Sequence, residues 1–418
     1  MHRPLFTCCL LACSSVTASA GTITVCAIGC DYTSINDAIA ASNDGDVIQL
    51  SAETYFEGEQ IDPLGKAIML RGVLNKAGEP ASLLDGSGTH RVLFCESGEG
   101  SGTVFDNLVI QNGFASGVSP DRSGGGMYNK DSRPTLTNCT FTNNSANAHG
   151  GGMYNDGSSP TLDNCGFTEN SANGYGGGMA SKYDSLPVLT DCSFSKNTAI
   201  RGGGMYNHAN SDPILKDTSF TANIAGNGGG MFNSGESDPR LEGCEFTLNS
   251  AFSGGGMSNR SSSPVLISCV LEENSADGDG GGIYNLQGGP ALASCTVKNN
   301  SAIGNGGGMY SFYNPTFKTN PSLTDSLICG NFPENISGNY GDLGANCVVA
   351  SCDECDAPSD PCPTDLDQNG RTDGDDVGAY FVSWGECRLD DCPADFNDDQ
   401  VVDGLDLGIL FSAWGRCE

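Results

Sequence analysis

Residues 150–175 have the sequence GGGMYNDGSSPTLDNCGFTENSANGY, and this stretch decides the fold because it is one unit of a repeat. A Gly-Gly-Gly triplet begins at residues 124, 150, 176, 202, 228, 254, 280 and 306, so that each triplet begins 26 residues after the one before. A fixed period of this length is typical of a solenoid, in which each repeat forms one coil and successive coils stack.

Apolar residues recur at fixed places within the unit. Each glycine triplet precedes Met or Ile, a Pro-x-Leu pair follows in every repeat, and a Cys-x-Phe pair comes next in four of the eight, as in Cys139 and Phe141. Apolar and polar residues alternate over only three or four positions, and Gly, Asn, Ser, Asp and Pro fill the stretches between, which favours short strands joined by turns. Three strands are expected in each coil, around Gly-Gly-Met, Pro-x-Leu and Cys-x-Phe. The sequence therefore predicts a mainly β fold, a right-handed parallel β-helix, over residues 21–350, with its regular repeats at 124–330.

Two columns of Asn are predicted to stack at the turns, where side-chain amides bond to each other and to the backbone. The first is Asn144, Asn170, Asn197, Asn223, Asn249, Asn274 and Asn300, and the second is Asn129, Asn155, Asn207, Asn233, Asn259 and Asn285, with Ser181 and Ser311 in the other two repeats. A third column contains Cys139, Cys165, Cys192, Cys244, Cys269 and Cys295, with Thr218 in one repeat. A metal or redox site is one interpretation of the cysteines, and a ladder of small buried thiols is the preferred one.

An aromatic residue follows the Met position in most repeats: Tyr128, Tyr154, Tyr206, Phe232, Tyr284 and Tyr310. Neighbouring residues of a strand point to opposite faces of the sheet. If Met faces inward, these rings form an aromatic stripe on the outer face. Such a stripe either covers the strands or stacks on sugar rings, and both roles stay open.

Gly-Gly-Gly-Met/Ile combined with Phe-x-x-Asn, as in Phe141 to Asn144, resembles the repeats of the polymorphic outer-membrane protein family and the wider pectate-lyase-like β-helix superfamily. The segment from Tyr32 to Ile39, with Gly45-Asp46 and Tyr55 after it, is similar to the start of many such β-helices. There, a short amphipathic helix plugs the end of the stack, which gives residues 21–60 a capping role, with Ile35, Ala38 and Ile39 on the apolar side. The architecture hosts lyases, hydrolases, adhesins and passenger domains, so the resemblance implies a fold and not a function.

The composition becomes acidic after residue 356, with 16 Asp and Glu against three Arg in residues 356–418. Two similar units of about 30 residues follow each other, and each ends in Trp-Gly-x-Cys. Each unit has oxygen-bearing side chains at loop positions 1, 3, 5, 9 and 12 and a backbone carbonyl at position 7, the ligands that Ca²⁺ requires, followed by an expected apolar helix. The predicted ligands are Asp365, Asp367, Asn369, Arg371 (carbonyl), Asp373 and Asp376 in the first loop, and Asp395, Asn397, Asp399, Val401 (carbonyl), Asp403 and Asp406 in the second.

Residues 362–418 resemble a dockerin domain of the bacterial kind that ends in Trp-Gly-x-Cys, with residues 351–361 as its linker. The resemblance implies bound Ca²⁺ and a cohesin-like or cell-surface protein partner. The second loop departs from the family pattern because Gln400 stands where Gly normally makes the sharp turn. The Cys362–Cys387 and Cys392–Cys417 spacings suggest one disulfide for each unit, although spacing alone does not fix the connectivity.

The other cysteines fit an exported protein. Cys26 and Cys30 are the expected local bridge, and disulfides are preferred to a zinc site for Cys347, Cys352 and Cys355 in the connector. Arg3, the apolar run at residues 5–13 and the small residues before Gly21 indicate a signal peptide over residues 1–20, and hence a secreted or cell-surface protein. The run that ends at Cys13 also resembles a lipoprotein cleavage site, which is the alternative.

The net charge of −32 disfavours nucleic acid as a partner, because phosphate contacts need Lys or Arg and the chain has only 19 of these. No stretch approaches the roughly 20 apolar residues of a transmembrane helix.

The near-uniform repeats favour a non-catalytic extracellular β-helix for adhesion, surface structure or glycan binding, attached through the calcium-stabilised module. The alternative is a polysaccharide lyase or glycoside hydrolase that acts on one face of the β-helix. Lyases of the resembling superfamily use carboxylates that hold calcium and an Arg or Lys base. No nucleophilic triad is evident in the sequence, and the catalytic residues are left unassigned. Charged residues of neighbouring loops are expected along one edge, as a solvated edge by preference or as a shallow catalytic site: Lys130, Asp131, Arg133, Lys182, Asp184, His208 and Arg260.

Overall fold

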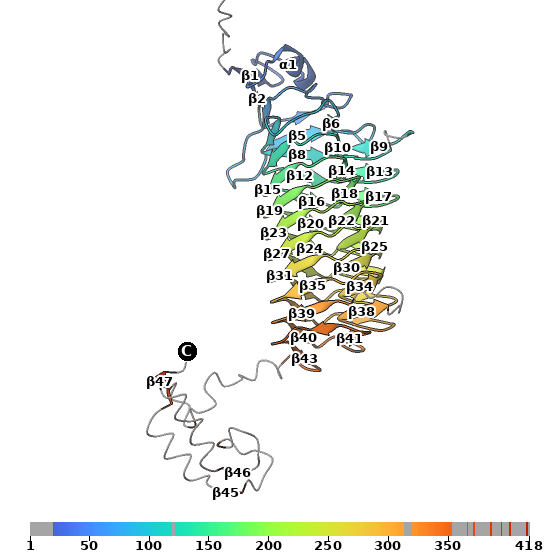
Figure 1. Cartoon of the computed structure of the whole chain (residues 1–418). Helices are drawn as coiled ribbons and strands as arrows, with labels where there is room; N and C mark the ends of the chain where they lie inside the picture. The colour runs from blue at the N-terminus through green and yellow to red at the C-terminus, as the bar shows by residue number, and fades with distance from the viewer. Residues whose placement is uncertain are drawn as a thin grey trace, which may run out of the picture. The chain divides into compact units, whose positions relative to one another are not determined.

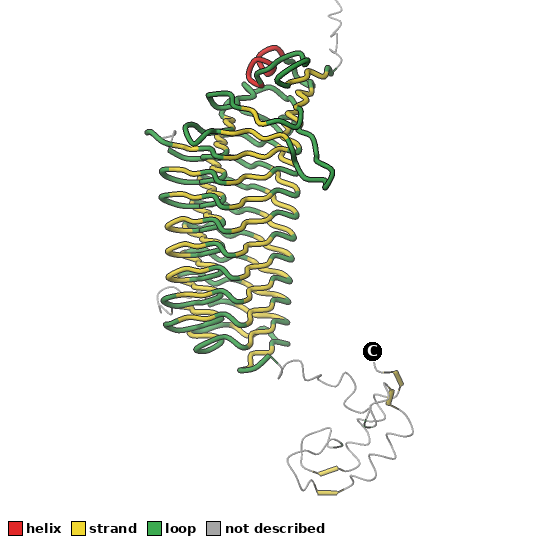
Figure 2. The backbone as a smooth tube through the Cα atoms, turned by 180° about the vertical axis from the view of Figure 1, so that it is seen from behind, coloured by secondary structure: helices red, strands yellow, loops and turns green. Residues whose placement is uncertain are grey.

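The computed structural model describes residues 20–118, 122–312 and 320–352, together with residues 366, 371–372, 385–386, 394, 401–402 and 415–416. Its contacts divide the chain into two units, Met1–Val348 and Val349–Glu418. The first unit is a stack of coils in which strands from successive repeats lie side by side (Figure 1), and the same coils are seen from behind in Figure 2. The predicted parallel β-helix is confirmed.

The three predicted strands of each coil form three parallel sheets. The leucine sheet contains β1 (Thr22–Val25), β2 (Val47–Leu50), β4 (Met69–Arg71), β7 (Val104–Asp106), β11 (Thr135–Thr137), β15 (Thr161–Asp163), β19 (Val188–Thr190), β23 (Ile214–Lys216), β27 (Arg240–Glu242), β31 (Val265–Ile267), β35 (Ala291–Ala293), β39 (Ser322–Thr324) and β42 (Gly341–Asp342). The phenylalanine sheet contains β3 (Thr54–Tyr55), β5 (Ser82–Asp85), β8 (Leu108–Gln111), β12 (Thr140–Thr142), β16 (Gly166–Thr168), β20 (Ser193–Ser195), β24 (Ser219–Thr221), β28 (Glu245–Thr247), β32 (Val270–Glu272), β36 (Thr296–Lys298), β40 (Leu327–Cys329) and β43 (Cys347–Val349). The methionine sheet contains β6 (Leu93–Cys95), β10 (Met127–Lys130), β14 (Met153–Asp156), β18 (Met179–Lys182), β22 (Met205–His208), β26 (Met231–Ser234), β30 (Met257–Arg260), β34 (Ile283–Leu286), β38 (Met309–Phe312) and β41 (Ile336–Ser337).

The expectation of only three strands for each coil is wrong, because the Ser-Ala pair after the first Asn column forms a fourth. This alanine sheet contains β9 (Phe114–Ala115), β13 (Ser145–Ala146), β17 (Ser171–Ala172), β21 (Thr198–Arg201), β25 (Ile224–Asn227), β29 (Ser250–Ser253), β33 (Ser275–Ala276) and β37 (Ser301–Ala302). Its Ala faces inward and is buried, as at Ala146 and Ala251. Two residues with one small apolar side chain carry too little pattern to be distinguished from a turn in the sequence.

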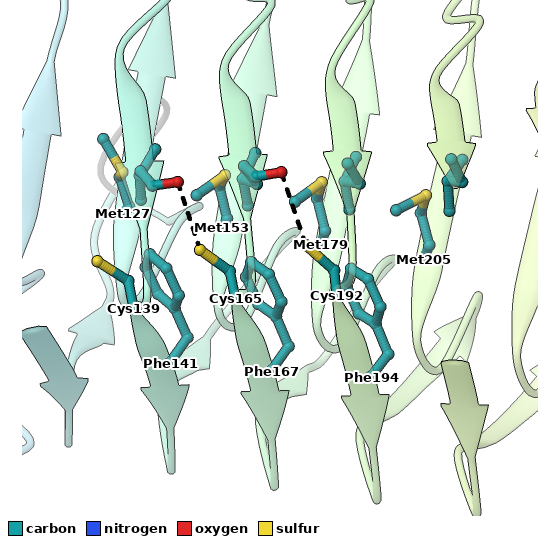
Figure 3. Close-up of a cluster of buried hydrophobic side chains, with 14 of the residues drawn as sticks. Met127, Cys139, Phe141, Met153, Cys165, Phe167, Met179, Cys192, Phe194 and Met205 are labelled. Atoms are coloured by element: carbon teal, nitrogen blue, oxygen red, sulfur yellow. Dashed lines mark hydrogen bonds between the residues drawn. The ribbon is translucent and has the colours of Figure 1, made fainter. Parts of the chain in front are cut away.

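The core consists of columns of identical side chains, because the pairing register places each residue beside its counterpart in the next coil. Figure 3 shows the Met, Cys and Phe columns facing each other inside the stack. The Phe rings of successive coils, from Phe141 to Phe246, stack with centroids 4.6 to 4.9 Å apart. This spacing follows the separation of the strands that carry the rings, about 4.8 Å.

The glycine triplets allow one coil to lie tightly on the next. The first glycine of each triplet has a positive φ, for example 62° at Gly150, a conformation that L side chains rarely adopt. A Cβ on the second glycine, Gly151, would collide with the backbone of Ser171 and of Gly177 in the neighbouring coil. The repeat of Gly-Gly-Gly is therefore a steric requirement of this corner.

Both predicted Asn columns form hydrogen-bonded ladders in the interior. In the first column, the side-chain amide of Asn223 donates to Oδ1 of Asn249 and to the carbonyl of Phe194, both at 2.9 Å. Its own Oδ1 accepts from the backbone and side-chain nitrogens of Asn197 at 3.0 and 2.9 Å. In the second column, Nδ2 of Asn233 donates to Oδ1 of Asn259 at 2.9 Å. The ladders satisfy most of the buried side-chain amides, and among the described residues Oδ1 of Asn129 and Oδ1 of Asn207 are the amide oxygens left without a partner.

The short amphipathic helix expected near the start of the β-helix is present. Helix α1 (Ile35–Ala41) begins after Ser34, whose hydroxyl accepts from the backbone N–H of Asp37. Ile35, Ala38 and Ile39 are its buried residues and belong to the main core. At the other end of the helix, Nζ of Lys66 donates to the carbonyls of Ile39, Ala40 and Ser42. The expected Cys26–Cys30 disulfide is also present.

The second unit is described at two pairs of short antiparallel strands. β44 (Arg371–Thr372) pairs with β47 (Gly415–Arg416), and β45 (Gly385–Glu386) pairs with β46 (Val401–Val402). Arg371 and Val401 are equivalent positions of the two sequence units, and so are Glu386 and Arg416. The loop of each unit therefore pairs with the end of the other, which is a symmetric exchange. The expected helices of this unit lie outside the described residues.

Candidate functional site

The outer face of the methionine sheet carries three columns of side chains, and the surface that they form is here called the outer groove. The floor is the position after Met, and one bank is the position two residues further along the same strand. The other bank is the residue just before each glycine triplet. Pairing between coils keeps each column in line: Tyr128, Tyr154, Ala180, Tyr206, Phe232, Ser258, Tyr284 and Tyr310 on the floor; Lys130, Asp156, Lys182, His208, Ser234, Arg260, Leu286 and Phe312 on the first bank; Ser123, His149, Tyr175, Arg201, Asn227, Ser253, Asp279 and Asn305 on the second.

The aromatic floor is a continuous stack over most of its length. Phe94 and Tyr128 are 5.6 Å apart between ring centroids, Tyr128 and Tyr154 are 5.5 Å apart, and Tyr206 and Phe232 are 5.6 Å apart. The rings point outward, as predicted. Much of the column covers the strands, the first of the two expected roles, because only 2 to 6% of the surface of Tyr128, Tyr154, Tyr206 and Phe232 is exposed.

A ring from the bank bridges one gap in the floor. Ala180 has no ring to contribute, and Tyr175 stacks on Tyr206 at 4.7 Å in its place. His149 lies on the other side of Tyr175 at 4.8 Å and also contacts Tyr154 at 6.0 Å. The stack therefore continues from Tyr154 to Tyr206 through two side chains that come from another column.

Cations cover the rings. The guanidinium of Arg91 lies 5.0 Å from the Phe94 centroid and 4.8 Å from that of Tyr128. That of Arg201 lies 5.4 Å from both Tyr175 and Phe232, and the Lys182 ammonium lies 5.6 Å from Tyr175 and 5.9 Å from Tyr206. These distances are those of cation–π contacts, which hold a charge over an apolar surface.

The centre of the groove, from the coil of Met179 to that of Met257, is cationic. None of the side chains that line it is acidic: Tyr175, Ala180, Lys182, Arg201, Tyr206, His208, Asn227, Phe232, Ser234, Ser253, Ser258 and Arg260. Among the described residues, Arg201 and Arg260 form no ion pair with a carboxylate. Unpaired positive charge is therefore concentrated here in a chain with a net charge of −32.

Lys182 and His149 form a close contact across the groove, with 3.2 Å between Nζ and Nε2. Burial, followed by the nearby Lys182 and Arg122 charges, lowers the pKa of His149 to about 4. Burial also lowers the pKa of Lys182, against the opposing effect of Asp156. The imidazole is therefore neutral at pH 7 and can accept a hydrogen bond from the ammonium group.

The charged residues that the sequence placed along one edge separate into three groups. Lys130, Lys182, His208 and Arg260 share one bank of the outer groove. Asp131 and Asp184 occupy turns with positive φ, at 49° and 59°. Arg133 lines a different hollow, together with Asp131, Glu99 and Ser159. The first group is the one that shares a bank of the outer groove.

Sequence reasoning did not identify the opposite bank. Arg201, Tyr175 and His149 each stand immediately before a glycine triplet, and the residue type at that place differs from coil to coil. Aligning the repeats on the glycine triplet would have identified this position as part of the same face. The position does not stand out in the sequence by itself, because no single residue type repeats there.

The cysteine column is a ladder of buried thiols, as preferred from the sequence. Sγ of Cys165 contacts the carbonyl of Leu136 at 3.6 Å, and Sγ of Cys192 that of Leu162 at 3.8 Å. The hydrogen bond with Cys165, and then burial, raises the pKa of Cys192, whereas the hydrogen bond with Cys269 lowers the pKa of Cys244. The burial of the whole column suits packing. In the connector, Cys347 and Cys352 are disulfide-bonded, as expected, while Cys355 lies outside the described residues.

The predicted calcium ligands lie outside the described residues, except for the backbones of Arg371 and Val401 in β44 and β46. Within the described part of the chain, no group of three or more His, Cys, Asp or Glu side chains is placed to hold a metal ion. In the same part, no helix is both long and apolar enough to span a bilayer.

The fold and the stacked columns define the first unit as a parallel β-helix. Residues 95–224 and 188–324 match the family described as "Right handed beta helix region", and together they cover more than half of the chain. The protein belongs to this right-handed β-helix family. No curated protein matches the sequence.

Three solved structures resemble the chain at low identity. The pectate lyase Pel9A shares 14% identity with a TM-score of 0.40 over 79% of this chain and 80% of that one. Tailspike protein 3 of bacteriophage CBA120 shares 12% with a TM-score of 0.34 over 76% of this chain and 58% of that one. The A-module of the mannuronan C-5 epimerase AlgE6 of Azotobacter vinelandii shares 14% with a TM-score of 0.29 over 75% of this chain and 93% of that one.

Proposed function

We propose that this protein is an extracellular β-helix that binds an acidic polysaccharide along the outer groove. The observation that carries the proposal is the row of cations held over aromatic rings, with Lys182, Arg201 and Arg260 in a stretch that lacks acidic side chains. The half-buried rings of Tyr284 and Tyr310 offer an apolar surface to the C–H faces of sugars, and Arg binds carboxylates in a bidentate manner.

The overall charge supports the selectivity of this surface. The chain has 51 acidic residues against 19 basic ones, so a polyanion is repelled by most of the molecule. Electrostatic attraction of the polyanion is then confined to the outer groove, so the polymer can bind along this one surface. Neutral polysaccharides gain nothing from this field, so the proposal favours uronate-rich or sulfated chains over neutral ones.

The ends of the chain give the binding unit its proposed context. Export follows from the signal-like residues 1–20, and attachment to a cohesin-like or other cell-surface partner follows from the dockerin-like units at 362–418 with Ca²⁺ in their loops. The exchanged pairing of Arg371 with Arg416 and of Glu386 with Val401 supports two equivalent units that stabilise each other.

The test is retention of the mature protein on immobilised polygalacturonate and alginate, with dextran as the neutral polymer. The wild type should be retained on the acidic polymers, and Arg201→Gln/Arg260→Gln should be retained at least tenfold less. Lys216→Gln, which removes an exposed charge from the leucine sheet, is the matched control and should behave as the wild type. Equal retention of all three proteins would overturn the proposal.

A second candidate function, a polysaccharide lyase, is favoured by Lys182, whose pKa is lowered by burial beside His149. An amine that is easier to deprotonate can remove the proton next to a uronate carboxylate. The electron pair then forms the C=C bond, and the glycosidic oxygen leaves and takes up a proton. Unsaturated chain ends produced by the wild type and abolished in Lys182→Met, even at polymer concentrations that saturate binding, would establish this candidate. Retention without new ends would support binding alone.

A further inference from the structure

From Tyr128 to Tyr310, two coils of the aromatic floor contribute no ring of their own, at Ala180 and at Ser258. Ser258 stands on the floor between Phe232 and Tyr284, where neighbouring coils carry an aromatic residue. At the other small residue, Ala180, Tyr175 from the bank fills the space. The bank residue in the coil of Ser258 is Ser253, which is too short to do so. The stack is therefore interrupted at Ser258 and resumes at Tyr284 and Tyr310, whose centroids are 5.4 Å apart.

A cavity of about 110 Å³ lies at this interruption, lined by Phe232, Tyr284, Ser258 and two arginines. Phe232 and Tyr284 are two coils apart, so their rings are separated by about 9.6 Å, twice the usual strand spacing. One ring placed midway would lie about 4.8 Å from each. That distance matches the stacking found elsewhere on the floor, for example 4.7 Å between Tyr175 and Tyr206.

The arginines define the charge of the ring that fits. Arg201 lies over Phe232 at 5.4 Å from the second bank, and Arg260 extends from the same strand as Ser258 on the first bank. Both line the cavity, and neither has a carboxylate partner among the described residues. A carboxylate on the rim of an inserted ring would meet a guanidinium on either side.

We propose that the cavity at Ser258 is a subsite for one uronic acid residue at the end of a polysaccharide chain or side branch. This subsite rests on the proposed binding function and specifies where and how the polymer is recognised. The ring enters edge-on between Phe232 and Tyr284, so its substituents radiate across the groove and its glycosidic bond points to solvent. A polysaccharide that continued on both sides of the bound residue would collide with the side chains of the two banks. The subsite therefore selects a terminal residue.

The first experiment is calorimetric titration of the full chain with free D-glucuronate, with D-glucose as the neutral ring. The wild type should bind glucuronate and not glucose. Ser258→Tyr restores the ring that the repeat carries at this column, so the protein should fold and should lose glucuronate binding at least tenfold. Ser258→Ala leaves the cavity open and should bind as the wild type.

A second experiment separates the subsite from the groove. Equal masses of long polygalacturonate and of its short oligomers differ in the number of chain ends, so the oligomers should compete at least tenfold better per unit mass for the subsite. If Ser258→Tyr binds long polymer and oligomers as the wild type does, the subsite is disproved while the proposed function stands. If the wild type is not retained on any acidic polymer yet binds glucuronate in a Ser258-dependent manner, the subsite stands and groove-wide binding fails.

Discussion

At the scale of the residue, burial decides the charge state of the groove. His149 is sandwiched between Tyr175 and Tyr154 and lies 3.2 Å from the ammonium of Lys182. A proton on this ring would add a second charge where solvent is scarce, so folding favours the neutral form. The same argument applies to Lys182, whose pKa is lowered by burial.

A pH dependence of stability follows. The folded pKa of His149 is about 4, below its ordinary value of 6.5. Between these values the unfolded chain binds more protons than the folded one, so the free energy of unfolding falls as the pH drops through that window. His149→Phe keeps the stacking and removes the titration. Thermal unfolding from pH 7 to pH 4 should therefore show a smaller fall in Tm for this variant, and an identical fall in both proteins would contradict the assignment.

At the scale of the element, the Asn ladder is the feature most sensitive to substitution. Asn223→Ala removes one rung: the carbonyl of Phe194 and the backbone N–H of Asn197 lose their side-chain partner, while Oδ1 of Asn249 keeps the backbone N–H of residue 223 and Nδ2 of Asn197 keeps the carbonyl of Phe167. Each buried group left unpaired costs about 1–3 kcal/mol, so a loss of at least about 2 kcal/mol in unfolding free energy is expected. Urea unfolding measures it. Asn173→Ala, an exposed amide, is the control and should change stability by less than about 0.5 kcal/mol.

The sequence predicted those elements whose side chains repeat. The Met, Leu, Phe and Asn columns recur with one residue type each, so their strands and their inward direction were readable. The alanine sheet was missed because a strand as short as Ser145–Ala146 has no measurable alternation. The burial of Tyr154 and Tyr206 was missed because His149 and Tyr175, which stack beside them, come from a column without a repeated residue. The subsite at Ser258 arises where the aromatic residue of the repeat is missing. Whether a missing ring leaves a cavity depends on whether a side chain from another column fills the space, and the sequence does not show this.

At the scale of the whole molecule, attraction to the polymer is electrostatic, and salt should weaken it. Raising the salt concentration from 0.05 to 0.5 M shortens the screening length several-fold, so retention of the wild type on polygalacturonate should fall steeply. Arg201→Gln/Arg260→Gln should show a shallower dependence because fewer counterions are exchanged. Parallel slopes in a titration of retained protein against salt would show that these arginines do not contact the polymer.

Calcium removal should separate the two units. The predicted ligands belong to residues 365–406, whereas no metal-holding group is found among the described residues of the β-helix. Chelation should therefore lower the Tm of the C-terminal unit and leave that of the β-helix unchanged in scanning calorimetry. Asp367→Ala should reproduce part of the shift without chelator. A single transition that moves as a whole on chelation would indicate a calcium site in the β-helix.

Each coil forms hydrogen bonds only with the coils before and after it, so whole coils can be inserted or deleted by changes in the gene. Duplication of one 78-nucleotide cassette, which encodes one coil, adds a turn of about 4.8 Å and leaves the columns in register on both sides. Recombination between the similar repeats can therefore lengthen or shorten the groove by whole coils. Exchange of a single cassette can also move a ringless coil along the stack.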